Sequence, residues 1–291
     1  VHLLKYDSVH GRAKQEISAN GDNIININGN AVKLFRERDP NNLPWGELDI
    51  DIVLECTGIF NSTETAAAHI KAGAKKVIIS APAKDEITPT IIHKINEHNI
   101  KPTDQVISIG SCTTNCLAPI AKIINDAFTI ESGFVTTVHA YTNDQNIIDN
   151  SHKNMRRARG AALSMIPTST GAAKAIGKVI PEIKGKLDGV AIRVPTPNVS
   201  MIDFTFTAEK AISAEAINNA IKNAANGALK GVLKYDDEEL VSVDYNHSPY
   251  SSIFDATGTK VTNGKLARVA AWYDNEWGFS ARMLDVAAII L

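Results

Sequence analysis

Short apolar strands alternate with a helix between residues 51 and 111 of this chain. Asp51–Thr57, Lys75–Ser80 and Gln105–Ser111 are apolar runs rich in β-branched residues, which is typical of buried strands. Ser62–Ala72 lies between the first two with helical spacing of its apolar residues, and Gly73 follows as a helix terminator. This alternation predicts a parallel sheet with helices on its faces.

The pattern changes after residue 112, where longer strands follow one another. We expect strands at Gly133–Ala140, Gly189–Val194, Ser200–Thr207, Leu240–Val243 and Lys265–Tyr273, with helices from Ser213 to about Asn226 and over Trp277–Leu291. A hairpin is expected around Asn28-Gly29. The predicted fold is α/β, with part of a doubly wound (Rossmann-type) parallel sheet and a second, α+β domain of mostly antiparallel or mixed sheet. The predicted limits are 1–111 with 276–291 for the first domain and 112–275 for the second.

Composition narrows the class of protein. The chain has 291 residues and a formal net charge of −2, with basic and acidic residues intermixed, so no nucleic-acid partner is expected. No apolar run approaches the roughly 20 residues of a membrane span, so no membrane association is expected. Three cysteines are too few and too irregular for a disulfide scaffold, which favours the cytoplasm. They also lack the spacing of zinc ligands, so no metal site is predicted.

The run Ser111–Pro119 contains the candidate catalytic residue, Cys112. It follows a predicted strand and opens a predicted helix, with Ser111 as a helix cap, so Cys112 is expected at the positive end of a helix dipole. That position lowers the pKa of a thiol and favours the nucleophilic thiolate. A cysteine taken alone is more often a small buried apolar residue. The remaining motifs decide in favour of a nucleophile.

Several long motifs match one enzyme family in order and spacing. They are Ser111–Pro119, Thr136–Gln145, Arg156–Gly160, Pro167–Lys174, Arg193–Asn198 and Trp272–Gly278, extended towards the N-terminus by Tyr6–Arg12, Glu37–Pro40 and Lys75–Lys84. The chain thereby resembles phosphorylating glyceraldehyde-3-phosphate dehydrogenase over essentially its whole length.

The resemblance implies a reaction and its partners. Glyceraldehyde 3-phosphate, inorganic phosphate and NAD would give 1,3-bisphosphoglycerate through a thiohemiacetal and a thioester, in glycolysis or gluconeogenesis. NAD is the first choice of cofactor. NADP is an alternative, because Asn150-Ser151 replaces an apolar pair common in NAD-restricted members. A homotetramer is implied, with a loop over Arg156–Thr170 reaching towards a neighbouring subunit.

The resemblance also implies roles for individual residues. Cys112 is the implied nucleophile and His139 the implied base. Thr142 and Arg193 would hold the phosphate of the substrate, and Ser111, Thr113, Arg159, Thr170 and Gly171 the inorganic phosphate. The cofactor would contact Arg38, Thr57, Gly58, Ser80 and Asn275. Arg156 and Arg157 are interpreted as a basic surface, as a single exposed arginine usually is.

The chain departs from the family in four places. The glycine-rich turn Gly-x-Gly-x-x-Gly is missing, so we expect a fragment without the first βαβ unit that binds dinucleotide poorly. Ile109-Gly110 stands where Asn-Ala is usual, and Phe279 where a tyrosine is usual. Asn150-Ser151 is the fourth departure.

Two other functions remain open at this stage. An erythrose-4-phosphate dehydrogenase would hydrolyse the thioester, and the ending Trp277–Phe279 slightly favours it, while Ser169–Gly171 and Tyr141–Asp144 favour the phosphorylating enzyme. The other is a binding protein on an inactive dehydrogenase frame, which the presence of both Cys112 and His139 disfavours. Alkylation of Cys112 across pH would separate an inert thiol from a reactive one.

Overall fold

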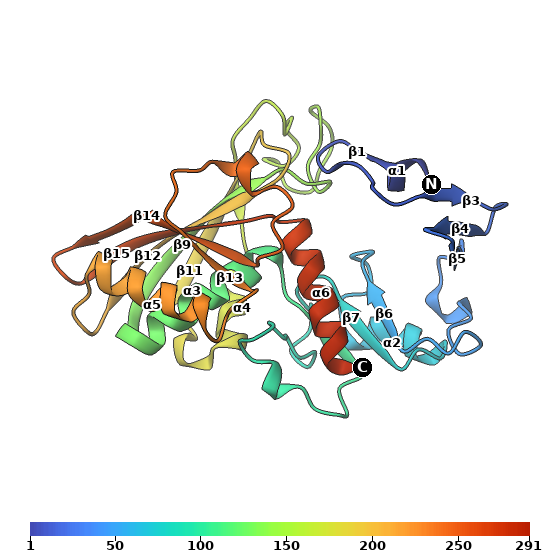
Figure 1. Cartoon of the computed structure of the whole chain (residues 1–291), viewed down its shortest axis with the longest axis horizontal. Coiled ribbons are helices and arrows are strands. Elements are labelled where there is room, and N and C mark those ends of the chain that lie inside the picture. The colour runs from blue at the N-terminus through green and yellow to red at the C-terminus, as the bar shows by residue number, and fades with distance from the viewer.

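A small parallel sheet forms the first part of the fold. The computed structural model describes residues 1–291, and in it β6 (Ile52–Glu55), β7 (Lys76–Ile79) and β8 (Val106–Ser108) lie side by side in that order (Figure 1). Helix α2 (Thr63–Lys71) connects β6 to β7, and the Ser62 side chain caps its start by accepting from the backbone N–H of Thr65. The predicted parallel strand–helix–strand unit is confirmed.

A seven-stranded mixed sheet forms the larger part. Its order is β10 (Ile166–Ser169), β11 (Leu187–Val194), β9 (Ile130–Ala140), β12 (Ser200–Ala208), β15 (Leu266–Tyr273), β14 (Ser252–Thr262) and β13 (Leu233–Asp236). Buried residues alternate with half-buried ones along β12, so one face of the sheet is more deeply covered than the other. The helices α3 (Cys112–Phe128), α4 (Ala172–Val179) and α5 (Ala214–Asn226) pack with this sheet around one core of 31 buried residues (Figure 1). The predicted mixed sheet is confirmed.

The last helix returns to the small sheet. Helix α6 (Trp277–Ile290) packs Val286 and Ile290 against Ile78 of β7 and Ile107 of β8. Asp274, three residues before this helix, accepts from the backbone N–H groups of Glu276 and Trp277 and so orders the start of the helix. The helix therefore connects the two sheets, as Figure 1 shows. The exact domain limits stay a prediction.

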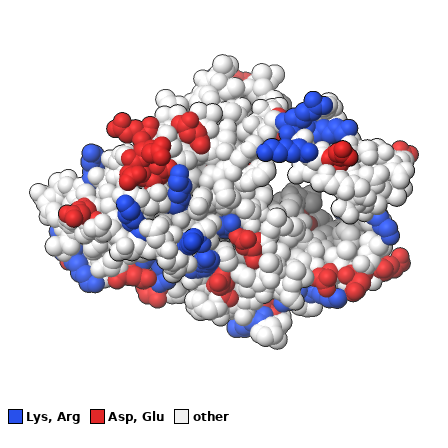
Figure 2. All heavy atoms as spheres, in the orientation of Figure 1, with Lys and Arg blue, Asp and Glu red and all other residues white.

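The N-terminal segment carries small elements that bury little. These are α1 (His2–Lys5), β1 (Tyr6–Asp7), β2 (Gly11–Arg12), β3 (Ile17–Ala19), β4 (Ile24–Ile27) and β5 (Asn30–Lys33). The expected hairpin is present, because β4 and β5 pair antiparallel and Asn28 and Gly29 both have positive φ. Ile17 is the single buried residue among the first 39. Figure 2 shows charges of both signs on this face of the molecule and a hollow beside the N-terminal segment.

One predicted strand is wrong. Leu240–Val243 is irregular chain that enters a 3-10 turn, η4 (Ser242–Tyr245), and Val241 and Val243 are exposed. The backbone N–H of Val241 bonds to the Asp244 carboxylate, which closes the turn and leaves no strand partner. The other 3-10 turns are η1 (Pro40–Asn42), η2 (Glu97–Asn99) and η3 (Pro181–Ile183). The elements that were not predicted are the strands β1, β2, β3, β10, β13 and β14 and the helices α1 and α4.

Candidate active site

Cys112 is the first residue of α3, and the three residues 109–111 separate it from the end of β8. The Ser111 hydroxyl caps the helix by accepting from the backbone N–H of Thr114 at 3.1 Å. Gly110, just before the cap, has φ of +67°, a conformation that glycine adopts without strain. The sequence therefore places a partly buried thiol at a helix N-terminus, as predicted.

His139 lies beside this thiol, although 27 residues separate the two in the chain. Cys112 Sγ and His139 Nε2 are 3.5 Å apart, and His139 is buried near the end of β9. Its other ring nitrogen, Nδ1, is 2.7 Å from the carbonyl oxygen of Ala140. Nδ1 thus has two neighbours, the Ala140 carbonyl, which accepts, and Arg193 Nη1, which donates and lies 2.8 Å away. In the tautomer whose Nδ1 proton goes to the carbonyl, the lone pair of Nε2 faces the sulfur, as a base requires.

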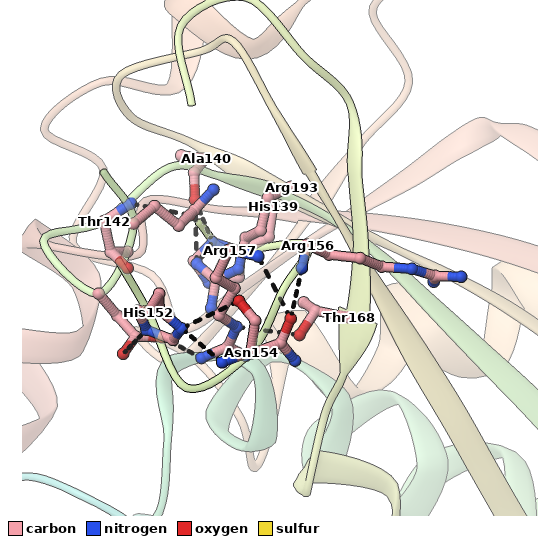
Figure 3. Close-up of polar contacts among 11 residues, drawn as sticks. His139, Ala140, Thr142, His152, Asn154, Arg156, Arg157, Thr168 and Arg193 are labelled. Atoms are coloured by element: carbon pink, nitrogen blue, oxygen red, sulfur yellow. Dashed lines mark hydrogen bonds and ion pairs between the residues drawn. The ribbon is translucent and has the colours of Figure 1, made fainter. Parts of the chain in front are cut away.

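Arg193 joins this pair through strand register. Strands β9 and β11 are parallel, and His139 and Arg193 are direct partners, so both side chains lie on the same face of the sheet. Arg193 Nη1 donates to the Ala140 carbonyl at 3.0 Å and lies 2.8 Å from His139 Nδ1 (Figure 3). Its Nε is buried without a partner. An anion on this guanidinium would supply the missing acceptor.

The protonation states differ from the sequence prediction. Burial raises the pKa of the Cys112 thiol, although the charge of Arg193 and hydrogen bonds involving Thr113 act in the opposite direction. Burial and the Arg193 charge lower the pKa of His139 to about 4. The predicted lowering of the thiol pKa is therefore wrong, because desolvation outweighs the helix terminus. At neutral pH the pair is a thiol facing a neutral imidazole.

A cavity of about 860 Å³ opens onto the pair. Of the predicted site residues, Cys112, His139, Thr142 and Asn275 line it. Ser8 and Val9 of the N-terminal segment also contribute to its wall, which the sequence analysis had not predicted. The volume is sufficient for a small phosphorylated metabolite together with one end of a larger ligand.

A chain of hydrogen bonds orients the Asn275 amide in this cavity. The backbone N–H of Ala140 donates to Ser200 Oγ at 3.0 Å, and the Ser200 hydroxyl donates to Asn275 Oδ1 at 2.8 Å. Because Oδ1 is occupied as an acceptor, the amide nitrogen is the group left to donate into the site. A carboxamide oxygen, such as that of nicotinamide, fits this donor.

The residues predicted for inorganic phosphate do not line the cavity. The Thr113 hydroxyl is buried and bonded to the Tyr273 hydroxyl at 2.8 Å. The Thr170 hydroxyl accepts from the backbone N–H of Ala172 at 3.2 Å, and Gly171 precedes the first residue of α4. Ser111 is used as the cap of α3. Their roles as phosphate ligands stay predictions.

The arginine segment presents Arg157, and not Arg159, to Arg193. The Arg157 side chain is 20% exposed, pairs with Asp144, and donates from Nε to the Thr168 hydroxyl at 3.0 Å. Its charge acts on the pKa of Arg193. The Arg159 side chain is 66% exposed and pairs with the equally exposed Asp149. In Figure 3 Arg157 lies beside His139 and Arg193, whereas Arg156 extends away from them.

The predicted cofactor residues other than Asn275 lie outside the cavity. Arg38 is an exposed residue after β5, and Thr57 and Gly58 form an exposed turn after β6. Ser80 follows β7 and donates its backbone N–H to the Glu55 carbonyl. Thr57, Gly58 and Ser80 thus follow the carboxyl ends of neighbouring parallel strands, where dinucleotides bind to sheets of this type.

Tyr273 is a site residue that the sequence analysis missed. Its buried hydroxyl bonds to the hydroxyls of Thr113 and Thr137, each at 2.8 Å. Its ring packs edge-on against the His139 imidazole, with centroids 5.9 Å apart. The tyrosine therefore supports both the helix that carries the thiol and the imidazole itself. Its motif had been noted, but nothing local distinguishes a supporting tyrosine from a core one.

None of the helices is both long and apolar enough to cross a membrane. No group of three or more His, Cys, Asp or Glu side chains is arranged to hold a metal ion.

The family models and the curated relatives that match this chain all name the same enzyme. Residues 111–275 match the family described as "Glyceraldehyde 3-phosphate dehydrogenase, C-terminal domain", and residues 1–63 match its "NAD binding domain". Among curated relatives, glyceraldehyde-3-phosphate dehydrogenase of Geobacillus stearothermophilus is 56% identical over 99% of this chain and 86% of that protein. The plasmid-encoded enzyme of Cupriavidus necator is 54% identical over 99% of this chain and 85% of its own length.

Proposed function

Because the chain belongs to the glyceraldehyde-3-phosphate dehydrogenase family, we propose that Cys112 and His139 are its catalytic nucleophile and base. The protein is an oxidoreductase that converts glyceraldehyde 3-phosphate and inorganic phosphate to 1,3-bisphosphoglycerate with NAD. The observation that carries the residue assignment is the 3.5 Å approach of Sγ to Nε2 in the wall of the cavity.

The first step forms a carbon–sulfur bond. Sulfur attacks the aldehyde carbon while Nε2 of His139 takes the thiol proton, so the nucleophile is generated only as it reacts. The imidazolium then gives that proton to the former carbonyl oxygen, which completes the thiohemiacetal. The neutral form of His139 is suited to this role, since an imidazolium could not accept the proton.

The second and third steps oxidise the carbon and release the product. His139 takes the hydroxyl proton as the carbon–hydrogen bond breaks, for which bound NAD would supply the hydride acceptor. The carbon is now a thioester of Cys112. An oxygen of inorganic phosphate attacks it, the carbon–sulfur bond breaks, and the sulfur recovers a proton from His139. The acyl phosphate then leaves, and Cys112 and His139 are again a thiol and a neutral imidazole.

Three residues would orient the reactants in these steps. Arg193 and Thr142 would hold the phosphate of the substrate, since the guanidinium lies next to the imidazole and has a donor without a partner. The Asn275 amide nitrogen would bind the carboxamide of the nicotinamide. NADP is the alternative cofactor of this proposal, because Asn150 and Ser151 are exposed polar residues.

The product distinguishes this function from its alternatives. We expect the purified full-length protein, given glyceraldehyde 3-phosphate, phosphate and NAD, to form an acyl phosphate that hydroxylamine traps as the hydroxamate. Free acid as the main product, independent of phosphate, would indicate an erythrose-4-phosphate dehydrogenase type of hydrolysis. No burst of NADH and no hydroxamate would contradict the assignment.

Arg157 is proposed as the phosphate ligand of the arginine segment in place of Arg159. Arg157→Gln is expected to raise the KM for inorganic phosphate about tenfold or more, because a charge-assisted hydrogen bond to the anion is lost. Arg159→Gln, which removes the same charge from an exposed position, is the matched control and should change that KM by less than about twofold. Steady-state rates at varied phosphate measure both, and a larger effect at Arg159 would reverse the assignment.

We also propose a cytoplasmic homotetramer. The segment from Ile147 to Met165 exposes apolar side chains, with Ile147 82%, Met155 88% and Leu163 86% exposed. Solvent-exposed apolar groups gathered on one loop favour burial against another subunit. All three cysteines are free, which supports a reducing compartment. Sedimentation equilibrium should give four times the 31.4 kDa chain mass, and a stable active monomer would contradict the tetramer.

A further inference from the structure

The three strands of the parallel sheet end at one edge, and Cys112 follows the last of them. Register pairs Glu55 of β6 with Ile79 of β7, and Ile79 with Ser108 of β8. Neighbouring strands lie about 4.8 Å apart, so Glu55 lies about 10 Å from Ser108 across the sheet. The turn that follows Glu55 therefore shares an edge with the nucleophile, at the carboxyl ends of the strands.

Glu55 is a buried carboxylate whose side chain is 2% exposed. Its Oε1 accepts from the backbone N–H of Thr57 at 2.7 Å and also from the Thr57 hydroxyl. Its Oε2 accepts from His69 Nε2 at 2.9 Å. Burying a carboxylate is costly unless hydrogen bonds satisfy it, and here three donors do so without a lysine or arginine.

Trp45 determines which nitrogen of His69 carries the proton. The indole N–H of Trp45 donates to His69 Nδ1 at 3.1 Å. Because an indole nitrogen can only donate, Nδ1 must carry the lone pair and Nε2 the proton that faces Glu55. The imidazole ring is also held edge-on against Phe60, with centroids 6.0 Å apart. A continuous series of hydrogen bonds thus runs from Trp45 through His69 and Glu55 to Thr57.

The turn held by this series is exposed and presents a free donor. The Thr57 hydroxyl accepts from the backbone N–H of Ile59 at 3.1 Å, and the Gly58 carbonyl accepts from Asn61 Nδ2 at 2.9 Å. Gly58 has φ of +72°, in the region that favours glycine. The turn is therefore fixed from its buried side, and the Gly58 N–H is left without a partner in the chain.

We propose that Glu55 is a positioning residue for dinucleotide binding, which holds the Thr57-Gly58 turn in the conformation that offers the Gly58 N–H to an oxygen of the cofactor. His69 and Trp45 act on the cofactor only through Glu55, by fixing its carboxylate. The inference rests on the proposed NAD-dependent function. It assigns a role to three residues that take no part in the chemistry at Cys112.

The test uses Glu55→Gln in the full-length protein, a substitution that keeps the size of the side chain but replaces one acceptor oxygen by a donor. We expect the dissociation constant for NAD, measured by titration calorimetry, to rise about tenfold, because the Thr57 N–H loses its charged acceptor. The kcat at saturating NAD should stay within about twofold of the wild type, since the thiol and imidazole are untouched. Hydrogen exchange at the Thr57 amide should accelerate. Glu64→Gln, an exposed acid in the first turn of α2, is the matched control.

Trp45→Phe provides a second, milder variant. It keeps the aromatic ring and removes only the indole N–H, so the His69 proton is no longer fixed, and NAD binding should weaken by about two- to threefold. If Glu55→Gln fails to fold, the NAD affinity of Trp45→Phe tests the inference instead. Equal NAD affinity in Glu55→Gln and Glu64→Gln, or a loss of kcat without a change in NAD affinity, would overturn the inference. Absent acyl phosphate in the wild type, with NAD affinity still responsive to Glu55, would instead count against the proposed function alone.

Discussion

Replacing Cys112 by alanine should abolish oxidation of glyceraldehyde 3-phosphate, with a loss of kcat/KM of at least about 10⁴-fold. Without the sulfur no tetrahedral carbon can form from which hydride could be expelled. The fold should persist, because the partly buried thiol lies at the edge of the core and the Ser111 cap of α3 remains. NADH formation in a single turnover, together with thermal unfolding of the same sample, measures both effects.

Cys116 offers a matched control for this experiment. It lies one turn further along α3 and is completely buried, with its sulfur 3.5 Å from Ser252 Oγ. Burial raises the pKa of its thiol well above the ordinary range, and it faces no base. Cys116→Ala should lose stability through the cavity that it leaves but keep its activity per folded molecule. Residual thioester formation in Cys112→Ala, or inactivity of a folded Cys116→Ala, would refute Cys112 as the nucleophile.

The local parts of this site could be predicted from the sequence. The strand before Cys112, the Ser111 cap and the helix after it depend on residues within one short segment, and the structure places them as expected. The alternation from residue 51 to 111 predicted the parallel sheet for the same reason. Leu240–Val243 was predicted wrongly because its composition is typical of a strand, but a strand also needs a partner from elsewhere in the chain. This segment has none.

The distances and charges of the site depend on tertiary structure. Nothing in the sequence gives the register that pairs Arg193 with His139, and the motifs alone do not show that the Arg157 side chain is mostly buried and the Arg159 side chain exposed. The thiol pKa was predicted in the wrong direction for a related reason. A helix N-terminus is visible in the sequence, but the burial that outweighs it comes from the surrounding chain. Alkylation of Cys112 across pH therefore does not by itself separate an active from an inert protein.

Replacing His139 by asparagine should show whether Cys112 reacts as a thiolate already formed at the helix N-terminus or as a thiol that His139 deprotonates during the reaction. We expect the rate of thioester formation at pH 7 to fall by about 10²–10⁴-fold, the usual contribution of a positioned base. Burial holds the pKa of Cys112 above its ordinary value, so little thiolate is present at neutral pH without a partner to take the proton. The stability of the fold should change little by comparison, because the introduced amide would keep a polar group near the Ala140 carbonyl.

The pH dependence then tests the base itself. In the wild type the pKa of His139 is about 4, so the imidazole is already neutral above pH 5 and the acylation rate should vary little from there to pH 8. In His139→Asn the rate should follow the thiolate fraction and rise about tenfold per pH unit over the same range, since each unit raises that fraction tenfold below the pKa. His98→Asn, at an exposed position, should keep the wild-type profile. A variant profile as flat as that of the wild type would show that His139 does not take the proton, because only the loss of a base makes the reaction depend on prior ionisation of the sulfur.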